Sequence, residues 1–350
     1  MRLALLLALA VSAAAAANIG AIDAICAPLA DAKTPGVAVL VRQNGRTIFQ
    51  RGYGVRDLRT SARIDSRTNF RLASFTKQFT ATAIMLLVHD GKLRYDQRLT
   101  ELFPDFPAYG QAIMVRHLLT HTSGLPDYED LMQPDRWTAA HQIQDLEVLD
   151  LLKQQTAGKY APGSSWAYSN SGYVVLGLIV AKVSGEPFGE FLRERIFQPL
   201  HMHHTLVYVN GKNTAPNRAY GHTKERDHFI ETDQSPTSAT LGDGGIYSNL
   251  EDLAQWDRAL ESHTLLSKAE MRPALTPVQV EERTDGVAYG FGWFLDPLEG
   301  RMCMWHTGST VGFRTVIERF TAEKLTIIVL CNRTDLDPKK LALETERLLR

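Results

Sequence analysis

Ser74 and Lys77 stand three residues apart at the start of a segment that the sequence predicts to be helical. From Phe75 to His89, apolar side chains recur at steps of three and four residues, and neither glycine nor proline interrupts them. On a helix this spacing brings the lysine ammonium within reach of the serine hydroxyl. The pair could therefore be a nucleophile with its activating base. A helix-capping serine followed by an exposed lysine has the same spacing, so the pair alone does not decide between them.

A tyrosine and an asparagine lie at the end of a loop that precedes a second predicted helix. The loop runs from Pro162 to Asn170, and the helix from about Ser171 to Val183. In extended backbone, Tyr168 and Asn170 point to the same side, because side chains alternate along such a chain. They would present a phenol and an amide together. A core tyrosine followed by a capping asparagine is the alternative.

A histidine, a threonine, a glycine and a serine follow one another from His306 to Ser309, in a predicted strand. Gly308 would let a substrate backbone approach closely, and the backbone N–H of Ser309 could stabilise an oxyanion. A strand end with a tight turn would give the same pattern.

The three groups together, in this order, resemble the motifs of the serine β-lactamase and penicillin-binding-protein superfamily. The Tyr-x-Asn form is similar to the class C β-lactamase branch and its esterase and peptidase relatives. The resemblance extends from about residue 32 to residue 333. Four further stretches carry it: Val115 to Pro126, Tyr168 to Gly177, Pro199 to Met202, and Gly244 to Asn249.

This resemblance implies a reaction through an acyl-enzyme, without a metal or cofactor. Ser74 would attack the acyl carbon, while Lys77 and Tyr168 would accept its proton. The backbone N–H groups of Ser74 and Ser309 would form the oxyanion hole. Tyr168 would then protonate the leaving group and help to activate the deacylating water.

The resemblance also implies a substrate-binding set of Asn170, His306, Thr307 and Gly308. His306 departs from the family pattern, in which a lysine supplies positive charge near a substrate carboxylate. A histidine with an ordinary pKa near 6.5 is mostly neutral at pH 7. We therefore expect neutral short-chain esters to be better substrates than β-lactams.

The predicted strands come from both ends of the chain. A hairpin joins Val37 to Arg42 with Thr47 to Tyr53 around Gln43-Asn44-Gly45. Short turns connect the later strands, so we expect antiparallel neighbours in one sheet. The later elements are four strands, 289–295, 302–306, 312–320 and 325–331, and a helix at 338–350; another helix is expected at 19–32.

We therefore expect an α/β (α+β) fold of the β-lactamase/transpeptidase type. Its antiparallel sheet would be flanked by helices and joined to a mostly helical lobe. The hydrolase domain would span residues 18–350, with a sheet lobe at about 18–73 and 244–350. The helical lobe would occupy about 74–243.

The first seventeen residues read as a secretory signal peptide: Arg2, an apolar run, then a tail composed mostly of alanine. No later apolar run approaches the roughly 20 residues that span a bilayer. We expect a periplasmic or secreted protein that is not inserted in the membrane after signal removal. A net charge of −1 with scattered basic residues gives no reason to expect nucleic-acid binding.

Other chemistry-bearing residues carry weaker hypotheses. The cysteines are interpreted as core thiols, with a bridge between Cys303 and Cys331 as an open alternative. His121 is an alternative base, less favoured than Lys77. His201, His203 and His204 lack the carboxylate or cysteine partners of a metal site. No Gly-x-Ser-x-Gly motif is present, which argues against an α/β-hydrolase.

Two classes of function remain open. The first is a serine hydrolase of the esterase or D-peptidase type, with a β-lactamase or DD-carboxypeptidase as the alternative. Its substrate would be a small ester, amide or peptide, peptidoglycan fragments among them. The second is a non-catalytic peptidoglycan- or peptide-binding relative that kept the fold.

Overall fold

A six-stranded antiparallel sheet forms the centre of the computed structural model, which describes residues 18–280 and 288–350. The expected signal peptide, residues 1–17, lies outside the described residues. The strand order is β10-β11-β12-β13-β1-β2. The strands are β1 (Val37–Gln43), β2 (Arg46–Tyr53), β10 (Phe294–Leu298), β11 (Arg301–Thr310), β12 (Phe313–Phe320) and β13 (Leu325–Cys331).

The two ends of the chain meet inside this sheet, as the sequence predicted. β1 pairs with β13 in continuous register from Val37 opposite Cys331 to Gln43 opposite Leu325. The β1–β2 hairpin turns at Asn44 and Gly45, which have φ values of 52° and 76°. Such a turn suits Asn-Gly because both residues tolerate the left-handed conformation.

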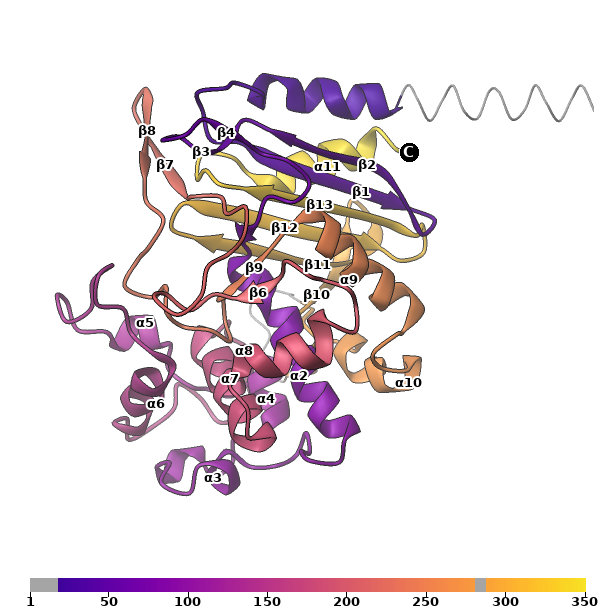
Figure 1. Cartoon of the computed structure of the whole chain (residues 1–350). Coiled ribbons are helices and arrows are strands. Elements are labelled where there is room, and N and C mark those ends of the chain that lie inside the picture. Colours follow the sequence, from indigo (N-terminus) through magenta and orange to yellow (C-terminus); the bar gives the residue numbers. More distant parts are fainter. Residues whose placement is uncertain (1–17, 281–287) are drawn as a thin grey trace, which may run out of the picture.

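The alternating side chains of the central strands enter two separate apolar layers. On β1, Val37, Val39 and Val41 pack in the layer that contains Ala342 of α11 (Pro338–Arg347). Ala38 and Leu40 face the opposite layer, which includes the apolar residues of α2 (Lys77–His89). Helices therefore cover both faces of the sheet (Figure 1), and this explains why β1 is an unbroken apolar run before its final polar residues.

The helical lobe surrounds α2, whose residues Lys77 to Leu87 are all buried. On a helix buried on every side, polar groups are costly unless they are hydrogen-bonded. Thr80 accordingly donates to the carbonyl of Gly242 at 2.6 Å, and Gln78 accepts from the indole of Trp256 at 3.1 Å. The other helices are α3 (Leu99–Leu102), α4 (Val115–Leu119), α5 (Tyr128–Leu131), α6 (Asp145–Lys153), α7 (Asn170–Ser184), α8 (Phe188–Leu192), α9 (Leu250–Ser262) and α10 (Lys268–Met271).

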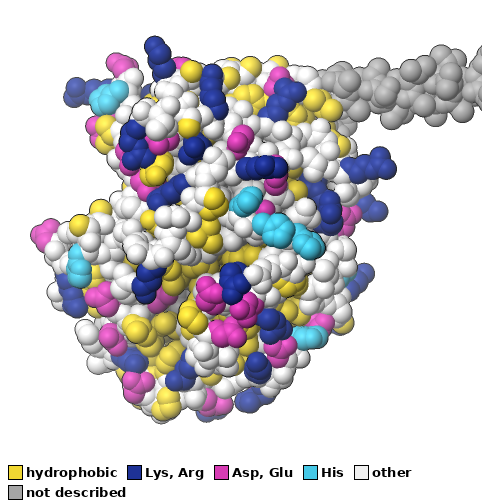
Figure 2. Space-filling model, viewed as in Figure 1, with side chains coloured by type: hydrophobic (Ala, Val, Ile, Leu, Met, Phe, Trp, Pro, Cys, Tyr) yellow, Lys and Arg dark blue, Asp and Glu magenta, His cyan; other side chains and the backbone are white. Residues whose placement is uncertain are grey.

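The remaining strands form three small sheets: β3 (Val55–Asp57) with β4 (Ala62–Arg63), β5 (Phe70–Arg71) with β9 (Ile246–Ser248) and β6 (Leu206–Val207), and β7 (His222–Glu225) with β8 (His228–Glu231). This architecture confirms the predicted fold class. In the space-filling view, positive and negative side chains are mixed over the face shown (Figure 2). None of the helices in the described part of the chain has the length and apolarity needed to cross a bilayer.

The strand predicted at 289–295 is wrong. Tyr289 makes only an isolated bridge with Phe294, where β10 begins. Gly292 between them has a φ of 77°, and a Cβ there would lie 2.8 Å from the carbonyl oxygen of Lys77. The chain therefore bends around the start of α2 and does not continue as a strand.

The disulfide alternative is also wrong, because all three cysteines are free and buried. Cys303 lies on β11 and Cys331 on β13, with β12 between them. Cys331 pairs with Arg314 at the start of β12, whereas Met304, the neighbour of Cys303, pairs with Arg319 near its end. The two thiols are thus separated both across and along the sheet.

Candidate active site

Ser74 lies in a short 3₁₀ turn, Ala73–Thr76, that leads directly into α2. The sequence predicted an α-helix from Phe75, so the α-helix begins two residues later than expected. Ala73 has a φ of 51°, a left-handed conformation that is strained for alanine. This turn places Ser74, which is half-buried, at the junction of the sheet and α2.

Lys77 is the first residue of α2 and is completely buried. Its Nζ lies 3.1 Å from Ser74 Oγ, 2.9 Å from Asn170 Oδ1 and 3.0 Å from the carbonyl oxygen of Asp243. A neutral amine has two N–H donors and one lone pair. The two carbonyl oxygens can accept only N–H donors, so the lone pair of a neutral Lys77 would face the Ser74 hydroxyl. The geometry is that of a base aimed at a nucleophile.

Tyr168 presents its ring to this lysine. Lys77 Nζ lies 5.0 Å from the ring centroid, and the His121 ring packs on Tyr168 with 4.3 Å between centroids. Within residues 18–280 and 288–350, the Tyr168 hydroxyl makes no hydrogen bond. The phenol is therefore held by ring contacts while its hydroxyl remains available.

Asn170 contacts the same lysine, although it begins α7 and is not in extended backbone as expected. Its backbone N–H donates to Asp127 Oδ2 at 2.8 Å, and its Nδ2 donates to Glu129 Oε1 at 3.2 Å. Burial, and next the charge of Asp127, raise the pKa of Glu129. The sequence interpretation missed these two carboxylates and the Asp243 carbonyl. The acidic run from Asp127 to Asp130 was a visible signal for the first two.

His306 is buried on β11, and both of its ring nitrogens have protein partners. Nδ1 donates to the carbonyl oxygen of Thr307 at 2.6 Å, and Nε2 accepts from the Tyr289 hydroxyl at 3.1 Å. Burial, and next the charge of Lys77, lower the pKa of His306 to about 3. The imidazole is thus neutral near pH 7, as expected. The expected role beside the substrate is less well supported, because neither nitrogen is free.

The next residues of β11 form an edge beside Ser74. β10 pairs with β11 only from Leu298 opposite Arg301 to Phe294 opposite Trp305, so residues 306–310 have no β10 partner. A Cβ on Gly308 would lie 2.0 Å from the carbonyl oxygen of Leu72, just before the serine turn. Glycine is therefore required for this close approach. Thr307 is half-buried, and Ser309 is exposed.

His121, the alternative base, lies buried beneath Tyr168. Its Nδ1 accepts from the backbone N–H of Ser169 at 3.1 Å. Burial, and next the charge of Lys77, hold the pKa of His121 well below its usual range. Its geometry is that of a support for the tyrosine and the loop before α7.

The three histidines at 201, 203 and 204 do not form a metal site in this structure. In the described part of the chain, no three histidine, cysteine, aspartate or glutamate side chains are grouped to hold a metal ion.

A serine next to a buried lysine, at the junction of an antiparallel sheet and a helical lobe, places the molecule among the serine hydrolases of the penicillin-binding and β-lactamase type. Comparison with known proteins agrees: the chain belongs to the beta-lactamase family, whose model matches residues 21–349.

Among curated proteins, the chain is 31% identical over 313 residues to penicillin-binding protein 4* of Bacillus subtilis, covering 85% of this chain and 68% of that protein. Among solved structures, it is similar to the octameric penicillin-binding protein homologue of Pyrococcus abyssi, with 26% identity and a TM-score of 0.81. That match covers 95% of this chain and 77% of the other.

A second similar solved structure is that of an amidase. The D-amino acid amidase of Ochrobactrum anthropi SV3, complexed with L-phenylalanine amide, is 26% identical with a TM-score of 0.76. The match covers 94% of this chain and 96% of the amidase. Family membership and these relatives identify the protein as a serine hydrolase related to the β-lactamases.

Proposed function

We propose that this protein hydrolyses ester or amide bonds through an acyl-enzyme on Ser74. The single observation that carries this proposal is the position of Lys77 Nζ, 3.1 Å from Ser74 Oγ and held by two carbonyl oxygens. When Lys77 is neutral, as a base must be, those carbonyls take its two N–H donors and leave its lone pair for the serine hydroxyl.

The proposed reaction follows from these positions. Ser74 Oγ forms a bond to the acyl carbon while its proton passes to Lys77, and the backbone N–H groups of Ser74 and Ser309 stabilise the oxyanion. The bond to the leaving group then breaks, and Tyr168, whose hydroxyl is unengaged, relays a proton to it. Water attacks the acyl-enzyme by the reverse path and releases the carboxylic acid.

The charges beside Asn170 favour a substrate that carries an amine. Asp127 and Glu129 both hydrogen bond to Asn170, and neither has a basic partner within the described residues. His306 provides no positive charge for a substrate carboxylate, because burial keeps it neutral. An acyl group with a free amine, as in an amino acid amide or ester, therefore fits this end of the site better than a carboxylate-bearing β-lactam. The D-amino acid amidase relative supports the same choice.

A substrate panel tests this proposal. We expect D-phenylalanine p-nitroanilide to exceed its N-acetyl derivative in kcat/KM by about tenfold, because the ammonium gains a charged hydrogen bond. Glu129→Gln should reduce that ratio, whereas Asp130→Asn should leave it unchanged, since Asp130 pairs with Lys159.

The other candidate functions predict different results. If nitrocefin were the best substrate and Glu129→Gln left the ratio unchanged, a β-lactamase or DD-carboxypeptidase would replace this proposal. If a fluorophosphonate probe failed to label the purified protein, a non-catalytic peptide-binding role would replace it.

We also propose that the protein acts outside the cytoplasm, in the periplasm or as a secreted enzyme. The apolar, alanine-rich start of the sequence supports this proposal. N-terminal sequencing of the protein from a fractionated culture tests it. An uncut N-terminus in the cytoplasmic fraction would contradict it.

A further inference from the structure

Four neighbouring side chains, three of them polar, form a row across the face of the sheet that packs against α9. The row lies away from Ser74. Register places Met304 of β11 beside Arg319 of β12, Arg319 beside Thr326 of β13, and Thr326 beside Arg42 of β1. Asp257 of α9 reaches this row. It pairs with Arg42, accepts from Arg319 Nε at 2.7 Å, and accepts from the Thr326 hydroxyl at 2.8 Å.

This buried cluster has more positive charge than negative. Arg42, Arg319 and Asp257 are 2%, 8% and 3% exposed, so one carboxylate balances two guanidinium groups away from bulk water. Arg319 Nη1 has one hydrogen-bond acceptor in the described part of the chain, the sulfur of Met304 at 3.9 Å. A thioether is a weak acceptor, so this partly buried guanidinium nitrogen can still donate to a stronger one. The site therefore favours an additional anion at Arg319 Nη1.

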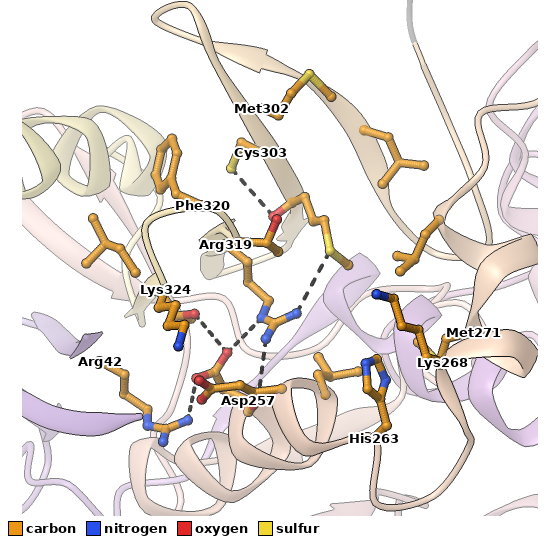
Figure 3. Close-up of a pocket in the computed structure, with 18 of the residues that line it drawn as sticks. Arg42, Asp257, His263, Lys268, Met271, Met302, Cys303, Arg319, Phe320 and Lys324 are labelled. Atoms are coloured by element: carbon orange, nitrogen blue, oxygen red, sulfur yellow. Dashed lines mark hydrogen bonds and ion pairs between the residues drawn. The ribbon is translucent and has the colours of Figure 1, made fainter. Parts of the chain in front are cut away.

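A pocket of about 550 Å³ opens directly over this cluster (Figure 3). That volume is within the range of roughly 300–1,000 Å³ typical of small-molecule sites. The pocket is lined by Arg42, Asp257 and Arg319 but by none of the residues assigned to the Ser74 site. Its apolar wall is formed by Leu260, Met271, Leu275, Leu295, Met302 and Met304.

The rim of the pocket is also mainly basic. Lys268 and Lys324 are exposed there, and neither forms a salt bridge with another described residue. His263 also lines the pocket, on the same side as Lys268 (Figure 3), and its Nδ1 has no hydrogen-bond partner in the described structure. Glu261 is the one acid in the lining besides Asp257. The pocket thus combines an apolar wall with unmatched positive charge at its floor and rim.

We propose that this pocket is a second ligand site that binds a small amphipathic carboxylate. The carboxylate would accept from Arg319 Nη1, and the alkyl body would pack on the methionine and leucine wall. Methionine side chains suit such a body because they adapt to irregular shapes. The site is separate from Ser74 and does not depend on the proposed reaction.

Calorimetric titration with octanoate tests this proposal. We expect octanoate to bind with 1:1 stoichiometry, and octan-1-ol, with the same alkyl body and no charge, to bind at least about tenfold more weakly. A protein labelled at Ser74 by a fluorophosphonate should bind octanoate as the unlabelled protein does.

Three variants locate the site. Arg319→Met removes the guanidinium and leaves Asp257 paired with Arg42, and we expect it to weaken octanoate about tenfold or more. Leu260→Trp fills the pocket without changing its charge, and it should also weaken binding. Arg258 lies on α9, like Leu260, but does not line the pocket, so Arg258→Met should bind octanoate as the wild type does. Circular dichroism checks that each variant is folded.

The proposal is overturned by any of three results: no heat of binding at millimolar octanoate, equal affinity for octanoate and octan-1-ol, or unchanged octanoate affinity in folded Arg319→Met and Leu260→Trp proteins.

Discussion

At the scale of single residues, hydrogen-bond capacity separates the roles of Lys77 and His306. Lys77 has two carbonyl partners and one hydroxyl partner, so its neutral form keeps a lone pair for Ser74. One ring nitrogen of His306 donates to the carbonyl oxygen of Thr307, and the other accepts from the Tyr289 hydroxyl. In the proposed mechanism the lysine therefore transfers the proton, whereas the histidine holds β11 and Tyr289 in place.

Replacing Ser74 by alanine is expected to abolish turnover and labelling by a fluorophosphonate, because no other group in this geometry can form the acyl bond. Stability should change by about 1 kcal/mol or less, since the Ser74 hydroxyl has one hydrogen-bond partner in the described residues, Lys77. Mass spectrometry of the labelled protein and thermal unfolding measure the two effects.

Ser309→Ala is the matched control for this experiment. It keeps the backbone N–H proposed for the oxyanion hole and alters an exposed side chain, so its activity should stay near the wild-type level. Labelling that persisted in Ser74→Ala would show that the nucleophile lies elsewhere.

At the scale of elements, the activity is expected to depend on how closely β11 approaches the serine turn. The α-carbon of Gly308 faces the carbonyl of Leu72 and the hydroxyl of Thr315, which itself donates to Leu72 at 2.8 Å. This contact fixes the distance between the free edge of β11 and Ser74.

Gly308→Ala is expected to push β11 away from the serine turn. An added Cβ would meet the Leu72 oxygen at 2.0 Å, and this backbone atom cannot rotate away. Overpacking of this kind costs about 1–3 kcal/mol, and kcat/KM should fall at least about 100-fold because the oxyanion donor moves. Gly20→Ala, where no atom lies within 4 Å of the added Cβ, is the neutral control. Wild-type kcat/KM in Gly308→Ala would exclude the proposed role of this edge.

Glu318 of β12 is a buried carboxyl group whose two oxygens have no hydrogen-bond partner in the described residues. Burial raises the pKa of Glu318 to about 8. Between about pH 4.5 and pH 8 the folded protein therefore holds a proton that the unfolded chain has released. The contribution of this group to the free energy of unfolding is therefore full below pH 4.5 and is lost as pH rises toward 8.

Glu318→Gln removes this titration while keeping the shape of the side chain. We expect the variant to gain stability relative to the wild type as pH rises from 4.5 to 8, by up to a few kcal/mol. Urea unfolding at four pH values measures the difference, and Glu225→Gln on an exposed strand is the control. A difference that does not change with pH would contradict the raised pKa.

At the scale of the whole molecule, the sheet is completed only by the last strands of the chain. β1 lies between β2 and β13, and α11 packs on the face of the sheet that carries Val37, Val39 and Val41. About 280 residues separate the paired strands β1 and β13, so the pairing depends on a long chain closure.

A chain that ends at residue 320 lacks β13 and α11 and is expected not to fold cooperatively. It would expose one edge of β1 and the apolar side chains that β13 covers in both layers. Differential scanning calorimetry and size-exclusion chromatography of the truncated and full-length proteins measure this. A sharp thermal transition in the truncated protein would show that the sheet does not need both ends of the chain.

The sequence by itself determined the fold class and most of the sheet. The Gln43-Asn44-Gly45 turn and the segments read as strands predicted β1, β2 and β13 to within one residue, because local backbone preference and burial agree there. The family resemblance also predicted one site from Ser74, Lys77, Tyr168 and Asn170, and in the structure the other three residues lie around the Lys77 side chain.

Only the tertiary structure decided the rest, because those features depend on segments far apart in the chain. The bend at Gly292 arises from its contact with α2, and the separation of Cys303 from Cys331 arises from β12. Packing against Tyr289 engaged Nε2 of His306 and buried the imidazole, which lowers its pKa. The excess positive charge beside Asp257 likewise required β1, β12 and α9 to meet, so no local pattern in the sequence could predict it.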